Sequence, residues 1–101
     1  MKRLLLPLFL GICLSLQALE PIPFTLRNSS LKAIYLEIPG VMNPNLSPLS
    51  NSGLSLEVGQ KIYFFHKGNR YLLLEVNSNN IDKTIKVPTL IKERKRELGL
   101  K

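Results

Sequence analysis

Hydrophobic and polar residues alternate along most of the chain between Ile22 and Val87, and this period of two predicts β-strands rather than helices. The alternation is found in residues 24–28, 32–38, 54–58 and 81–87. Clusters of Asn, Ser, Pro and Gly separate these stretches, as expected for turns. Lysines interrupt the last stretch, which is typical of an edge strand.

The most apolar part of the chain predicts a β-hairpin. Residues 61–67 and 70–77 flank Gly68-Asn69, a dipeptide suited to a two-residue turn. In that register one face of the hairpin joins Tyr63 and Phe65 to leucines, and the other joins Phe64 and His66 to Leu73 and Tyr71. Both faces are therefore apolar. Such a hairpin is either central in a layered fold or covered by a loop, a helix or another protein, and we favour a cover.

Residues 41–53 are predicted to form one long loop. The segment contains Pro44 and Pro48 among asparagines and serines, with four apolar residues interspersed. Two interpretations remain open for this loop. It packs as a lid over one face of the hairpin, which we favour, or it is a preorganised recognition loop.

The chain ends in a predicted short helix. Thr89 is expected to cap a helix over residues 89–98, and Gly99 is expected to end it. Only Leu90, Ile91 and Leu98 of this helix can face a core. Together the patterns predict a mainly β fold, a small β-sandwich or partly open barrel of about six strands with a short C-terminal helix.

The first residues have the pattern of a signal peptide. Lys2 and Arg3 precede an apolar run over residues 4–16, and cleavage after Ala18 fits best. We therefore expect a signal peptide over residues 1–18 and a single domain over residues 19–101, exported to the periplasm or secreted. A membrane anchor through residues 4–19 is the secondary alternative, because 16 residues fall short of the ~20 that span a bilayer.

The positive charge is concentrated at the two ends. The chain has a net charge of +7, and removal of residues 1–18 leaves 12 basic and 7 acidic residues, or 12 − 7 = +5. Five basic and two acidic residues lie within residues 92–101. This end is either a solvated helix, which we favour, or a contact with an anionic envelope surface through Lys92, Arg94, Lys95 and Arg96. Export argues against nucleic acid as the partner.

The residue types present exclude most catalytic sites. His66 is the single histidine, and the single cysteine, Cys13, lies in the predicted leader after Ile12, which does not favour lipidation. No metal-ligand spacing, nucleophile elbow or phosphate-binding glycine motif occurs. We expect no enzyme activity, no cofactor and no metal; a small hydrolase would require His66 to lie in a cleft.

Four segments carry a family resemblance. Residues 24–28, 38–48, 58–62 and 90–95 resemble a group of short exported proteins of uncharacterised function in Bacteroidota. The resemblance covers nearly all of residues 24–100. It implies no activity and no site residue.

We expect a noncatalytic binding or interaction module of the cell envelope or periplasm, whose partner is a protein or another envelope component. The contacts are expected from the loop and the hairpin, namely from Val41, Met42, Asn43, Pro44, Asn45, Leu46, Phe64 and Tyr71. The alternative is an inhibitor of an exported hydrolase that inserts the Pro-rich loop 41–53 into an active site.

Overall fold

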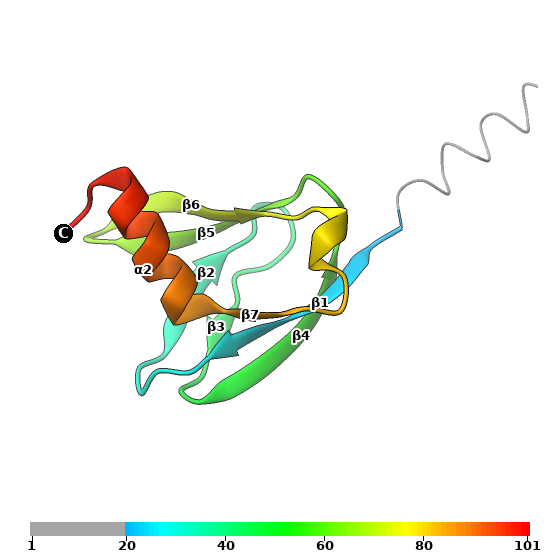
Figure 1. Cartoon of the computed structure of the whole chain (residues 1–101), viewed down its shortest axis with the longest axis horizontal. Helices are drawn as coiled ribbons and strands as arrows, with labels where there is room; N and C mark the ends of the chain where they lie inside the picture. Colours follow the sequence, from blue (N-terminus) through cyan, green and yellow to red (C-terminus); the bar gives the residue numbers. More distant parts are fainter. Residues whose placement is uncertain (1–19) are drawn as a thin grey trace, which may run out of the picture.

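The computed structural model describes residues 20–101 (Figure 1). The predicted signal peptide 1–18, the alternative anchor 4–19 and Cys13 fall outside these residues. The described part is mainly β with one C-terminal α-helix, as predicted. Its elements are β1 (Ile22–Asn28), β2 (Ile34–Glu37), β3 (Asn45–Leu46), β4 (Ser50–Leu56), β5 (Lys61–His66), β6 (Asn69–Glu75), the 3-10 turn η1 (Ser78–Asn80), β7 (Thr84–Lys86) and α2 (Val87–Leu98).

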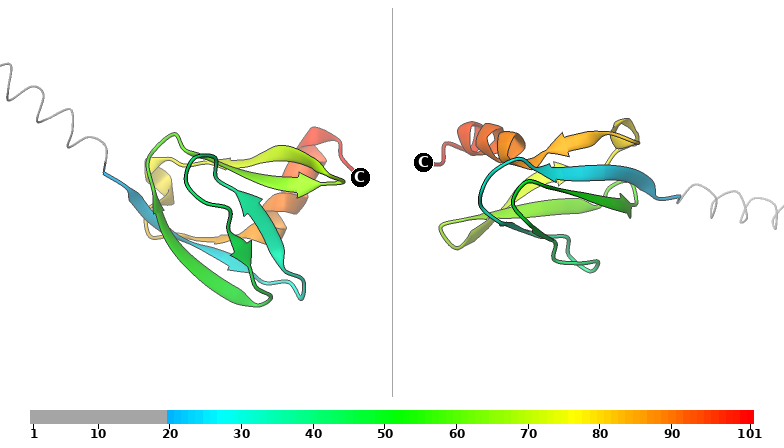
Figure 2. Two further views of the ribbon diagram at one scale, coloured as in Figure 1. Left: turned by 180° about the vertical axis from the view of Figure 1, so that it is seen from behind. Right: turned by 90° about the horizontal axis from the view of Figure 1, so that it is seen from below.

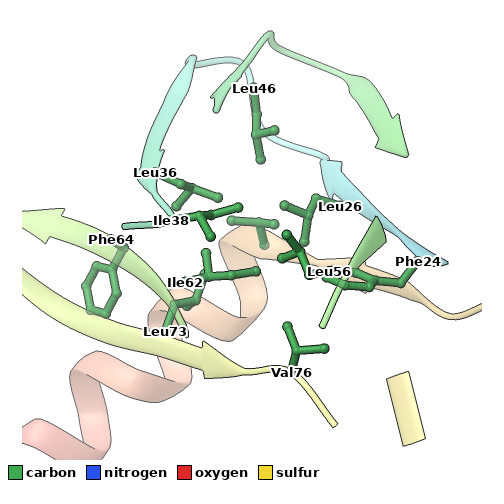
Figure 3. Close-up of a cluster of buried hydrophobic side chains, with 11 residues drawn as sticks. Phe24, Leu26, Leu36, Ile38, Leu46, Leu56, Ile62, Phe64, Leu73 and Val76 are labelled. Carbon is green, nitrogen blue, oxygen red and sulfur yellow. The ribbon is translucent and has the colours of Figure 1, made fainter. Parts of the chain in front are cut away.

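The strands form two sheets that do not close into a barrel (Figures 1 and 2). The first sheet has the order β4–β1–β7, with β1 antiparallel to β4 and parallel to β7. The second has the order β3–β2–β5–β6 and is antiparallel throughout. Their inner faces contribute to one core (Figure 3).

The alternation of apolar residues decides which side chains enter this core. Leu26 of β1, Leu36 of β2 and Phe64 of β5 are each no more than 1% exposed. Complete burial of such a side chain contributes roughly 1.5–3 kcal/mol to the free energy of unfolding. The buried apolar residues are Phe24, Leu26, Leu36, Ile38, Leu46, Leu56, Ile62, Phe64, Leu73, Val76 and Val87.

The prediction of one long loop over residues 41–53 is wrong, because strands occupy much of this segment. Residues 45–46 form β3, and residues 50–53 are the first half of β4, paired along their length with β1. A run of Ser, Asn and Gly has little strand propensity of its own, so its conformation is set by pairing with a distant strand. The irregular part shrinks to residues 38–44 and a short turn before β4.

The hairpin is correct, but its turn lies one residue earlier than predicted. Lys67 and Gly68 form the two-residue turn, and both have positive φ (51° and 83°), as a type I′ turn requires. Phe64 consequently pairs with Tyr71 rather than with Leu73. From Tyr63 to His66 the shift is two residues, so these side chains stay on the faces predicted for them. A β-bulge between Ile62 and Tyr63 changes the register beyond them, and Leu74, predicted on the face of Tyr63, pairs with Ile62 and packs against the core.

Helix α2 begins earlier than predicted. Its first residue is Val87, and Thr89 is not the cap; Lys86 precedes the helix without a side-chain capping bond. Pro88 fits the first turn because its missing N–H would have no partner inside the helix. No helix within residues 20–101 has the length and apolar character that a membrane crossing requires.

The end of α2 is as predicted at Gly99. This residue has φ 71°, and the Leu100 N–H donates to the Lys95 carbonyl at 2.8 Å, which closes a Schellman motif. Leu90 and Ile91 pack against the core. Leu98 is 41% exposed, and Leu100 packs against the core instead.

Candidate functional site

The outer side of the second sheet carries aromatic and charged side chains together. In β2, Leu36 points inward and Tyr35 and Glu37 point outward; in β5, Phe64 points inward and Tyr63 and Phe65 outward. Arg70 of β6 lies opposite Phe65. We call Tyr35, Glu37, Tyr63, Phe65 and Arg70 the aromatic face. In the left view of Figure 2 this sheet lies in front, and no helix of residues 20–101 covers it.

Arg70 ties the three strands of this face together. Its guanidinium carbon lies 4.2 Å from the centroid of the Tyr63 ring, and its Nη1 lies 3.1 Å from the Glu37 Oε1. Both charged side chains are partly exposed (45% and 31%), so the ion pair adds about 0–1 kcal/mol to stability. Its main effect is to fix the position of these groups.

Tyr35 and Phe65 leave much of their rings in solvent, at 64% and 48% exposed. The β2–β5 register, continued by one pair, places them opposite each other. Beside them lies an open hollow of about 390 Å³, lined also by Glu37, Asn43 and Pro44. The face therefore offers two adjacent aromatic rings at the border of a hollow with a carboxylate and an amide.

A second hollow of about 500 Å³ adjoins the same two rings. It lies between α2 and the strands β2 and β5, with Ile91 of α2 in its lining and Lys32 and Lys95 around it. Because Tyr35 and Phe65 line both hollows, they form a ridge between them. The first hollow contains the carboxylate of Glu37, and the second is bordered by the two lysines.

The turn after β2 exposes two more apolar side chains. Val41 is 47% and Met42 48% exposed. The Ile38 N–H donates to the Met42 carbonyl at 2.8 Å, and the Ile38 carbonyl accepts from the Val41 and Met42 N–H groups at 3.0 and 3.1 Å. Gly40 supplies the positive φ (75°) that this tight turn needs.

The predicted contact residues are divided between surface and core. Val41, Met42, Asn43 and Asn45 are exposed, and Pro44 is buried but lines the first hollow. The prediction is wrong for Leu46 and Phe64, which are each 1% exposed. Tyr71 is half-buried against Phe64, with 5.9 Å between ring centroids. Leu46 and Phe64 stabilise the sheet from its inner side, and Phe64 also lines the second hollow. Tyr71 stays partly exposed.

The lid interpretation of the loop is not supported by burial. Of its four apolar residues only Leu46 enters the core, and Val41, Met42 and Leu49 are each close to half exposed or more. A short turn held by its own backbone bonds has little chain left to fold back over the hairpin. The segment adds to the exposed apolar surface instead of covering it.

The residues missed from the sequence are the outward ones, Tyr35, Glu37, Phe65 and Arg70. Charged residues on the same face of the hairpin could have identified this face as the outer one. Lys61 and Arg70 share the hairpin face of Tyr63 and Phe65, and charged residues mark the side that faces solvent.

The basic residues of α2 have different roles. Arg94 donates from Nε to the Leu72 carbonyl of β6 at 2.9 Å and pairs through Nη1 with Glu97 at 3.2 Å. Lys92 and Arg96 are exposed, and Lys95 is half-buried beside the second hollow. Arg94 is thus held in a structural contact, whereas Lys92 and Arg96 are available to a partner.

The described residues hold no cluster of three or more His, Cys, Asp or Glu side chains that could bind a metal ion. Every buried side-chain N or O atom within residues 20–101 has a hydrogen-bond partner. His66 is half-buried at the end of β5, opposite Asn69 at the hairpin turn.

No family model, curated protein or solved structure was found to match this chain. The resemblance to short exported proteins of Bacteroidota stays a prediction.

Proposed function

We propose that the protein is a noncatalytic, exported binding module of the cell envelope or periplasm, and that it contacts a partner protein through the aromatic face. The observation that carries the proposal is the exposure of Tyr35 and Phe65, at 64% and 48%, on adjacent strands of an uncovered sheet face. Tyr, Phe, Met and Arg are the residue types enriched in protein interfaces, and Tyr and Arg dominate their binding energy.

The surroundings of these rings support the same role. Both rings project from strands of a hydrogen-bonded sheet, and Arg70 is already held by Tyr63 and Glu37. A surface ordered before binding loses less entropy when a partner docks. The two hollows beside the ridge provide room for side chains of the partner.

Replacement of the ridge tests this proposal. The variant Tyr35→Ser/Phe65→Ser removes both rings without entering the core. Immobilised mature protein is incubated with detergent-solubilised envelope proteins, and captured proteins are quantified by mass spectrometry. We expect a partner enriched by the natural protein to fall at least about tenfold with the variant, since hot-spot truncations cost about 2 kcal/mol or more.

The matched control is Val58→Ser/Ile81→Ser, which removes two exposed apolar side chains (60% and 51%) from elsewhere in the chain. Capture should be unchanged in this control. An identical set of captured proteins from the natural protein and the Tyr35→Ser/Phe65→Ser variant would contradict the proposal.

The inhibitor of an exported hydrolase is retained as a second candidate because of one observation. Val41 and Met42 project from a turn fixed by three backbone hydrogen bonds, and a rigid apolar tip can enter an active site at low entropic cost. The inserting segment would be residues 38–44 rather than the whole of 41–53. In a panel of exported peptidases and glycosidases, at least one enzyme should be inhibited by the natural protein and not by the Val41→Ser/Met42→Ser variant. Equal inhibition by both proteins would contradict this role.

A further inference from the structure

Three of the four sheet edges in the described part of the chain are protected against pairing with another strand. The edge strand β3 has two residues, and β7 has three and ends in Lys86. The edge of β6 carries Arg70 and Glu75, and Arg94 of α2 donates to its Leu72 carbonyl at 2.9 Å. Short strands, charges and covering elements are the devices by which soluble proteins prevent edge-to-edge association.

The fourth edge, β4, has none of these devices. Its seven residues, Ser-Asn-Ser-Gly-Leu-Ser-Leu, include no charge and no proline. All seven pair with β1 in an unbroken antiparallel register, from Ser50 opposite Asn28 to Leu56 opposite Ile22. Among residues 20–101, Figures 1 and 2 show no element on the outer side of this strand in views from the front and from behind.

Backbone bonds on the far side of β1 identify which groups of β4 point outward. The Thr25 N–H donates to the Lys83 carbonyl at 2.9 Å, and the Pro23 carbonyl accepts from the Asp82 N–H at 2.7 Å, so both residues direct their groups away from β4. Paired residues in an antiparallel ladder either exchange both bonds or neither. The partners of Pro23, Thr25 and Arg27, which are Ser55, Gly53 and Asn51, therefore direct their N–H and C=O groups to the open edge.

We propose that β4 pairs with β4 of a second copy of the chain, antiparallel about a two-fold axis at Gly53. In this arrangement Gly53 lies opposite Gly53 of the other copy, and Asn51 lies opposite Ser55 on either side. Each of these three pairs exchanges two backbone hydrogen bonds. The two three-stranded sheets become one continuous sheet of 3 + 3 strands.

A second copy fits this edge because an identical strand has the same length and the same spacing of outward groups, which makes the contact self-complementary. No charge of β4 faces a like charge across the axis, since the strand has none. An added Cβ at Gly53 would meet no atom within 4 Å, so the face of the sheet is open beside the centre of the contact, where the two glycines would lie opposite each other. The contact uses the first sheet, and the aromatic face on the second sheet stays free in each copy.

Sedimentation equilibrium of the mature protein tests the proposal over a concentration range of about 100-fold. We expect the weight-average mass to rise from that of one chain towards that of two. The thermal midpoint should rise with concentration over the same range, because the dimer exists only in the folded state. A single-chain mass at every concentration would overturn the proposal.

Substitutions at Gly53 locate the contact. Gly53→Pro removes one outward N–H and no β1–β4 hydrogen bond, and Gly53→Lys places like charges directly opposite each other across the axis. Both should lower self-association at least about tenfold, whereas Gly53→Ala, which keeps the N–H, should leave it unchanged.

The lysine variant decides the result if the proline variant does not fold, because an exposed lysine is well tolerated on an edge strand. A dimer that persists in the folded Gly53→Lys protein would show that another surface associates. Tyr35→Ser, on the other sheet, should leave the dimer intact.

Discussion

Asn28 is the one fully buried polar residue among residues 20–101. Its Nδ2 donates to the Lys32 and Leu46 carbonyls at 2.7 and 3.0 Å, and its Oδ1 accepts from the Ser30 N–H at 3.0 Å. The side chain therefore joins the end of β1 to the β2–β3 sheet. It also fixes the turn that leads into the aromatic face.

Replacement of Asn28 should destabilise the fold strongly. Asn28→Ala leaves the buried Leu46 carbonyl and the partly buried Lys32 carbonyl and Ser30 N–H without their partner, which costs about 3 kcal/mol. Chemical denaturation measures this loss as a lower free energy of unfolding. Asn51→Ala removes only an exposed contact to Arg27 and should change stability by less than about 0.5 kcal/mol. Equal effects of the two substitutions would contradict the bridging role of Asn28.

Lys67 occupies the first position of the hairpin turn with φ 51°, a region that a lysine enters at a cost. Asn-Gly is the preferred pair for a type I′ turn, so Lys67→Asn should raise stability by about 0.5 kcal/mol. Thermal unfolding measures the gain. Lys83→Asn, at a position without positive φ, is the matched control and should give no gain. A lower midpoint for Lys67→Asn would contradict the turn assignment.

Single residues also show what the sequence could not decide. The two hairpin faces are equally apolar, so periodicity alone does not say whether Phe64 or Phe65 enters the core. Packing decides it, since Ile62, Phe64 and Leu73 are buried together by the facing sheet. The charges of Lys61 and Arg70 indicate that their face, and with it Phe65, is the solvent side. This signal is weaker than the apolar pattern of the hairpin.

At the scale of elements, most strands with their own alternation were predictable and strands without it were not. Alternation was misleading at residues 81–83 and 57–58, which lie outside β7 and β4. β1, β2 and the β5–β6 hairpin follow local patterns of apolar residues. The first half of β4 has the composition of a turn and becomes a strand by pairing with β1, which lies more than 20 residues earlier. Pairing between distant segments leaves no local signal.

The basic side of helix α2 is suited to contact with an anionic envelope surface. We propose that the exposed Lys92 and Arg96 provide this contact, while Arg94 stays bound to β6 and Glu97. Each basic residue near an anionic membrane adds about 1 kcal/mol to binding. The mature protein should co-sediment with phosphatidylglycerol vesicles at low salt and not with phosphatidylcholine vesicles.

Lys92→Gln/Arg96→Gln should weaken vesicle binding by roughly tenfold or more, and added salt should release the natural protein. Lys61→Gln/Lys67→Gln removes the same charge from exposed positions outside the helix and should have a smaller effect. Equal losses in both variants would mean that net charge, and not α2, controls adsorption.

At the scale of the whole molecule, the proposed role depends on export. The sequence predicts cleavage after Ala18 and a mature chain that begins at Leu19. Intact-mass measurement of the protein recovered from the periplasm or medium should give the mass of residues 19–101. A mass that includes Met1 would contradict the signal peptide and favour the anchor.

The whole molecule presents three surfaces with different expected partners: the aromatic face on one sheet, the open β4 edge on the other, and the basic side of α2. The mainly β architecture that separates them was predictable from the sequence. The identity of the exposed rings was not, because it depends on how the two sheets face each other.

The aromatic face is the central claim, and site-specific photo-crosslinking from Tyr35 in living cells tests it most directly. A photoreactive phenylalanine replaces Tyr35, and a second protein carries it at Ile81, which is also about half exposed (51%) and outside both hollows. We predict a discrete crosslinked partner from position 35 that is absent from position 81 and is lost when Phe65→Ser is added. The same products from both positions, or a product at position 35 that is indifferent to Phe65→Ser, would contradict the claim.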